Sequence, residues 1–111
     1  MAIIRSIPSE RIINGQIIIS SENALVSETQ FRTKGENTVV VKGVEFCKVI
    51  LDHSSTDHVT VKALTKVLIL PSSGRIDEEF DEILIDKGAC VEFRFISGNW
   101  YILSSDGVKQ A

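Results

Sequence analysis

The residues with the clearest chemical potential lie in one polar stretch, Asp52 to His58, which holds both histidines of the chain. Its two Asp-His pairs supply nitrogen and oxygen donors of the kind that bind metals. A tetrahedral site needs a full set of ligands in fixed positions, and no third and fourth ligand accompanies these two histidines in a flexible connection. We therefore interpret the stretch as a polar turn, and we predict no metal site and no cofactor.

A second candidate is the acidic run Asp77-Glu78-Glu79-Phe80-Asp81-Glu82. Paired carboxylates hydrolyse glycosides when one of them has a raised pKa in an apolar cleft and the other is held several ångströms away. Consecutive acids in a polar connection lack the environment that tunes their pKa values in this way. The run is interpreted as a solvated loop with a single aromatic side chain that can tuck beneath it.

Nucleophilic catalysis has no better support in the sequence. Serines are plentiful, but there is no nucleophile-elbow sequence and no glycine-rich oxyanion loop. Cys47 and Cys90 lie in apolar runs without the basic or helix-N-terminal setting that activates a thiol, and their separation fits no zinc pattern. We interpret them as two reduced core thiols, with a cross-strand disulfide as the alternative. The sequence thus predicts no catalytic residue, and a protein that is not an enzyme.

The candidate residues discussed above lie on or between segments that the sequence predicts to be β-strands. Val91 to Phe95 alternates apolar with charged residues at the two-residue period of a half-buried strand, and Ser97-Gly98-Asn99 turns it into a second strand that begins at Trp100. Asn14-Gly15 between two isoleucine runs predicts another hairpin. Further strands are predicted at 38–41, 44–51, 58–63, 67–70 and 83–85, with weaker signals at 3–4, 12–13, 17–19 and 29–33, whereas 21–27 is compatible with a helical turn.

These segments amount to about eight to ten strands at the spacing typical of a sandwich or barrel. No long helical pattern is present to connect parallel strands, so antiparallel sheets are expected. We predict one all-β domain over residues 1–111, an antiparallel β-sandwich that is jelly-roll-like.

Composition limits the partners. The net charge of −3, with acidic and basic residues interspersed, leaves no basic stripe for a phosphate backbone. No apolar run is long enough to span a bilayer, and the N-terminus lacks the features of a signal peptide. We expect no contact with nucleic acid or membrane, and synthesis in a cytoplasm.

Two groups of apolar residues are candidate contact surfaces. Adjacent strand residues face opposite sides, so Trp100 is expected in the core and Tyr101 outside, where it covers a neighbouring strand or contacts a sugar or protein. Doubled isoleucines make a strand apolar on both faces, and a partner subunit, a loop or the chain's own N-terminal arm would cover the outer one. The doubled isoleucines assigned to a partner interface are Ile3, Ile4, Ile12 and Ile13.

Three motifs follow one another in the C-terminal half: Pro71-Ser72-Ser73-Gly74, Gly88-Ala89-Cys90-Val91-Glu92-Phe93 and Gly98-Asn99-Trp100. In this order they resemble the β-rich structural modules of phage virions, in which a strand ending in Pro-x-x-Gly is followed by a Gly-x-x-Val-x-Phe strand and a Gly-x-Trp hairpin. Size, all-β character and this ending are also similar to the small decoration, or staple, protein of the epsilon-type short-tailed phages that infect enterobacteria.

That resemblance implies a jelly-roll-like fold and homodimers that bind the major capsid protein on the virion surface and tie neighbouring coat subunits together. It carries no functional residue over to this chain. The sequence therefore predicts a structural virion protein that stabilises a capsid. The alternative is a carbohydrate-binding or receptor-binding β-sandwich module, suggested by Trp100-Tyr101.

Overall fold

The computed structural model describes residues 17–20, 23–35, 37–54 and 56–107. Over these ranges the regular secondary structure consists of ten β-strands. They include no helix long and apolar enough to cross a membrane. The predicted strands at Ile3-Ile4 and Ile12-Ile13 and the Asn14-Gly15 hairpin lie outside the described residues.

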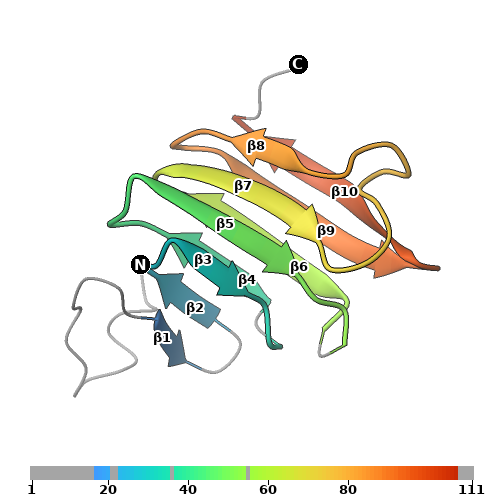
Figure 1. Cartoon of the computed structure of the whole chain (residues 1–111), viewed down its shortest axis with the longest axis horizontal. Helices are drawn as coiled ribbons and strands as arrows, with labels where there is room; N and C mark the ends of the chain where they lie inside the picture. Colours follow the sequence, from blue (N-terminus) through green and yellow to red (C-terminus); the bar gives the residue numbers. More distant parts are fainter. Residues whose placement is uncertain (1–16, 21–22, 36, 55, 108–111) are drawn as a thin grey trace.

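The strands form two sheets that stack face to face (Figure 1). The six-stranded sheet A has the order β1-β2-β4-β6-β9-β10, and the four-stranded sheet B has the order β3-β5-β7-β8. Sheet A consists of β1 (Ile17–Ser20), β2 (Asn23–Val26), β4 (Thr38–Val41), β6 (His58–Ala63), β9 (Cys90–Ile96) and β10 (Asn99–Asp106). Sheet B consists of β3 (Gln30–Arg32), β5 (Phe46–Leu51), β7 (Lys66–Pro71) and β8 (Ile83–Ile85).

From β2 to β7 the chain crosses from one sheet to the other after every strand. Each strand therefore lies parallel to the strand two places earlier, in the pairs β2–β4, β4–β6, β3–β5 and β5–β7. The register stacks core residues on one another, as in the row Phe31, Val49 and Ile69 of sheet B. This stretch is a coil of the β-solenoid kind, in which successive turns of the chain bury a continuous core.

Antiparallel strands close both ends of the coil. β1 pairs with β2 at one end, while β8 pairs with β7, and β9 pairs with both β6 and β10, at the other. Because these pairs are antiparallel, the parallel stacking of strands stops at both ends of the coil.

The prediction of an all-β fold is confirmed, and its two facing sheets are sandwich-like. The prediction of antiparallel sheets is wrong for the four parallel pairs, so both sheets are mixed. We expected parallel neighbours to need a helical crossover, whereas here a strand of the opposite sheet makes the return. Jelly rolls are built from antiparallel strands, so that connectivity does not describe β2 to β7.

The helical turn considered for residues 21–27 is replaced by β2. Ala24 and Val26 are fully buried in the core, and the strand pairs on both sides, with β1 and with β4. Tertiary pairing therefore decides the conformation of this segment over its local helical tolerance.

The core lies between the sheets, and alternate residues of most strands point into it. In β2 and β4 three consecutive residues are buried, so that Leu25 and Val40, which alternate with the core residues, are buried as well. In β6, Val59, Val61 and Ala63 are buried, while the residues between them are half-buried on the outer side. Trp100 and Phe93 are the largest fully buried side chains, which confirms the inward position expected for Trp100. Most of the remaining core is β-branched, and such side chains suit a pleated surface.

Candidate interaction surface

The two histidines have different partners and do not converge. His53 stacks on Phe95, with ring centroids 4.1 Å apart and planes inclined by 7°. His58, on β6, places Nε2 2.8 Å from Oε2 of Glu92 on β9. In the part of the chain that the structure describes, no group of three or more His, Cys, Asp or Glu residues is arranged to hold a metal ion.

Glu92 joins His58 to Ser104 on the outer face of sheet A. Ser104 Oγ donates to Glu92 Oε1 at 2.9 Å, and the hydrogen bonds from His58 and then from Ser104 lower the pKa of Glu92. In a catalytic triad the histidine stands between the nucleophile and the carboxylate. Here the carboxylate stands in the middle, so the arrangement ties β6, β9 and β10 together and does not activate the serine.

The two cysteines are free thiols in different sheets. Cys47 lies on β5 in the core, and its burial, with a smaller contribution from the charge of Glu28, raises its pKa to about 11. The thiol therefore stays protonated at neutral pH, which is the unreactive form. Cys90 is half-buried and points to the outer side of β9.

The acidic run forms a loop tied firmly to β10; we call residues 77–82 the acidic loop. Asp77 N donates to Trp100 O at 2.8 Å, and Asp77 Oδ1 accepts from Ile102 N at 2.9 Å. Tyr101 Oη donates to Glu78 Oε2 at 2.7 Å, which raises the pKa of Tyr101. Asp77 and Glu78 have φ of 54° and 60°, in the left-handed region that residues other than glycine rarely adopt. These bonds to β10 hold the loop in one strained shape.

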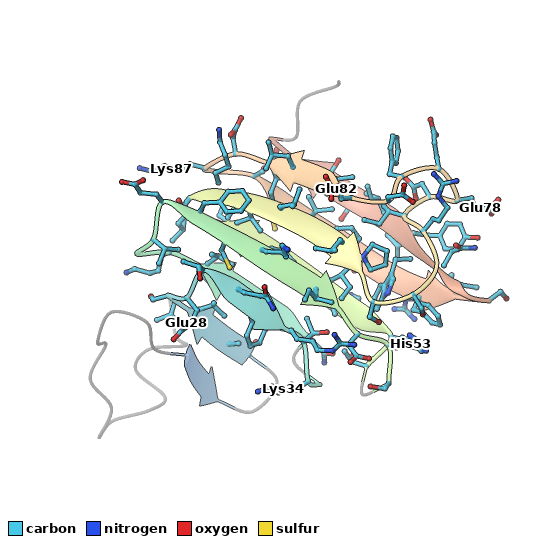
Figure 2. All side chains as sticks on the ribbon, in the orientation of Figure 1. Glu28, Lys34, His53, Glu78, Glu82 and Lys87 are labelled. Carbon is cyan, nitrogen blue, oxygen red and sulfur yellow. The ribbon has the colours of Figure 1, made fainter. Side chains whose placement is uncertain are left out.

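Arg75 completes the anchoring of the acidic loop from its other side. Its Nη2 donates to Glu79 O at 2.7 Å, and its Nε lies 3.2 Å from Asp81 Oδ1. Within the described ranges this leaves the carboxylates of Glu79 and Glu82 without a hydrogen bond or ion pair. Phe80, between them, is 39 % exposed. Figure 2 shows the loop at one end of the molecule, marked by Glu78, away from Lys87.

The outer face of sheet B is apolar and basic. Residues that alternate with the core point outward from its strands, and the register sets Lys48 beside Leu68 and Leu68 beside Leu84. In the neighbouring rows Ile50 pairs with Leu70, and Phe46 pairs with Lys66. Phe46 is 41 % exposed and Leu84 is 53 % exposed. We define the sheet B face as Phe46, Lys48, Ile50, Lys66, Leu68, Leu70 and Leu84.

In the described part of the chain, no acidic side chain neutralises the positive charges of the sheet B face. Neither Lys48 nor Lys66 forms a side-chain hydrogen bond or ion pair with any other described residue. The four strands of sheet B contain no Asp or Glu. Arg32, on β3, differs because its Nε lies 2.7 Å from Asp52 Oδ2. The sheet B face thus offers apolar area and two cations that have no acidic partner among the described residues.

The sequence-predicted contact residues are only partly placed. Ile3, Ile4, Ile12 and Ile13 lie outside the described residues. Tyr101 points outward as expected for its position next to Trp100, and its hydroxyl is bound by the acidic loop.

Sequence reasoning missed the sheet B face. The alternation was present in Lys66-Val67-Leu68-Ile69-Leu70, but apolar residues at four consecutive positions conceal which of them face outward. Lys48 and Lys66, each next to a residue that is buried, were the available signal.

No protein-family model matches this chain, and no curated protein matches it.

Proposed function

We propose that this chain is a structural protein of a phage virion, which binds the major capsid protein on the outside of the shell and ties neighbouring coat subunits together. The observation that carries the proposal is the sheet B face, on which large apolar side chains remain partly exposed. Contiguous apolar area on the surface of a small domain marks a protein-binding site. The likeness of the C-terminal half to virion modules supplies the class of partner.

The proposed mechanism is physical. A protein that binds only the assembled lattice stabilises that lattice by mass action. A homodimer attaches at two points, so that moderate single contacts give strong overall retention. No reaction is required of the chain in this role, which is one of structure and not of catalysis.

The test is binding to undecorated shells of short-tailed enterobacterial phages. Purified protein should cosediment with the shells at a fixed stoichiometry and raise their melting temperature. Leu68→Lys, in the sheet B face, should reduce the bound fraction. Thr60→Lys is the matched control on sheet A, where the lysine would lie opposite Glu92. Wild-type protein that neither sediments with the shells nor stabilises them would contradict the proposal.

A carbohydrate-binding or receptor-binding module has less support. Such sites need several exposed aromatic and polar side chains that converge, and the hydroxyl of Tyr101 is already bound by Glu78. A glycan array decides between the two roles. Binding of a glycan that is lost in Tyr101→Ala would replace the virion proposal.

A further inference from the structure

We infer that two copies of this chain form a two-fold dimer in which the acidic loop of each copy lies on the sheet B face of the other. The inference concerns the chain alone. In the virion, the short acidic loop would cover only part of the sheet B face and leave the rest of it to the coat protein, and the contact would supply the homodimer on which the proposed function relies.

The first argument is charge complementarity. The sheet B face carries Lys48 and Lys66, which have no partner among the described residues, on strands that contain no acid. The acidic loop carries Glu79 and Glu82, whose carboxylates are equally unpaired there. One surface holds surplus cations and the other surplus anions, so a contact between copies would neutralise both. Complementary charges of this kind set the partner and the orientation of an interface.

The second argument is apolar complementarity. Phe80 lies between the two unpaired acids in the sequence and is 39 % exposed. Aromatic side chains are common anchors of protein interfaces when they insert into an apolar surface. The face offers such a surface, in which Leu68 lies beside Leu84 and Ile50 beside Leu70.

The third argument is that the acidic loop is already shaped. The bonds of Asp77 and Glu78 to β10, and of Arg75 to the loop, fix its backbone before any partner arrives. A preorganised loop loses little conformational entropy on binding. The left-handed backbone of two consecutive acidic residues is maintained at a cost in strain, which a presenting role would explain.

Two-fold symmetry follows from the presence of both surfaces on one chain. In a two-fold dimer, a loop-to-face contact in one direction implies the same contact in the other. The two contacts reinforce each other, because the second forms at a high effective concentration once the first is made.

The experiment exchanges the charges of the two surfaces. A face variant carries Lys48→Glu and Lys66→Glu, and a loop variant carries Glu79→Lys and Glu82→Lys. At low salt, light scattering should give twice the chain mass of 12.3 kDa for the wild type. Each variant alone sets like charges against each other in both contacts, so we expect its dissociation constant to rise by about a hundredfold or more. An equimolar mixture of the two variants should regain the dimer, because both of its contacts join opposite charges.

The matched control is a chain with Lys42→Glu and Lys62→Glu, which alters net charge as the face variant does but leaves the sheet B face unchanged. It should remain dimeric. Circular dichroism and thermal melting show whether each variant is folded. If a double variant unfolds, Lys66→Glu and Glu79→Lys alone, both at exposed positions, replace the pair in the same mixing design.

A wild type that stays monomeric at every concentration overturns the inference. So does a dimer that survives in both variants, or a mixture of folded variants that does not reassociate. A chain that stays monomeric but still binds shells would overturn the dimer and leave the virion role intact. A chain that dimerises but binds no shell would overturn the virion role and leave the dimer intact.

Discussion

The outer faces of the two sheets differ in whether their polar side chains form hydrogen bonds and ion pairs with one another. On sheet A, across β6, β9 and β10, polar residues bind one another: His58 and Ser104 both hold Glu92, and Lys62 Nζ donates to Gly88 O at 3.1 Å. On sheet B, the outward residues are mainly apolar, and Lys48 and Lys66 bind nothing in the described structure.

The alternation of inward and outward residues in a strand is therefore not enough to make its outer side a polar, solvent-exposed face. Alternate residues of β6, β9 and β10 point into the core, as they do in sheet B, but on the other side these three strands of sheet A carry polar groups that bind one another, beside the exposed Ile96. A face that leaves apolar area and charge uncompensated is stable in water but gains by association. We therefore assign the binding role to sheet B.

The largest predicted effect is a loss of stability, and it compares a phenylalanine of the core with a phenylalanine of the sheet B face. Phe93→Ala removes a fully buried ring and should lower the free energy of unfolding by about 3–5 kcal/mol. Phe46→Ala, at 41 % exposure, should lower it by about 1 kcal/mol or less. Urea denaturation in high salt, which weakens charge-assisted association, measures both. Equal losses would mean that Phe46 belongs to the core and not to a free face.

The next effect tests the close approach of two turns, where Gly74 lies against Gly98. At Gly74, φ is +76° and an added Cβ would lie 1.9 Å from Gly98 O. Gly74→Ala should therefore lower the free energy of unfolding by roughly 2 kcal/mol or more. Gly98→Ala is the control, since its φ of +94° is unfavourable but no atom lies within 4 Å of the added Cβ, and it should cost about 1 kcal/mol. Thermal melting that ranks Gly98→Ala as the more damaging change would refute this account of the contact between the two turns.

A smaller effect comes from exchanging polarity between the outer faces. Leu84→Thr, at a site 53 % exposed, should change the free energy of unfolding by no more than about 0.5 kcal/mol and should reduce binding of an apolar dye. Thr60→Leu, on sheet A, should increase dye binding. Unchanged dye binding in Leu84→Thr would show that the sheet B face is not the accessible apolar surface.

The smallest effect concerns pH and belongs to sheet A. Because the pKa of Glu92 is lowered in the folded chain, its charged form stabilises the fold fully above the ordinary pKa of 4.5. That contribution is lost as pH falls through the lowered pKa. Melting curves of wild type and Glu92→Gln should therefore differ near neutral pH and converge in acid. A difference that grows as pH falls would reverse the assigned sign.

The strands were largely predictable because each carries a local signal. Alternation in Val91 to Phe95 and the Ser97-Gly98-Asn99 turn identified β9 and β10 without any tertiary information. Pairing direction was not predictable in the same way, since it depends on which sheet receives each strand. A local pattern does not show that β3 leaves sheet A and that β4 returns to it.

The binding surface was less predictable than the fold. Whether Leu68 or Ile69 faces the core depends on register with β5 and β8, because either residue suits a buried position. The left-handed backbone at Asp77 and Glu78 could not be predicted, because neither position is a glycine. It results from bonds to Trp100 and Tyr101, which are distant in sequence.

The most direct test of the assignment to sheet B compares lysines on the two sides of the molecule. Acetylation rates of individual lysines can be read by mass spectrometry at high concentration and after dilution to monomer. The account predicts that Lys48 and Lys66 are protected at high concentration, whereas Lys42 and Lys62 react at the same rate in both samples. Protection of Lys62 with no change at Lys48 and Lys66 would contradict it.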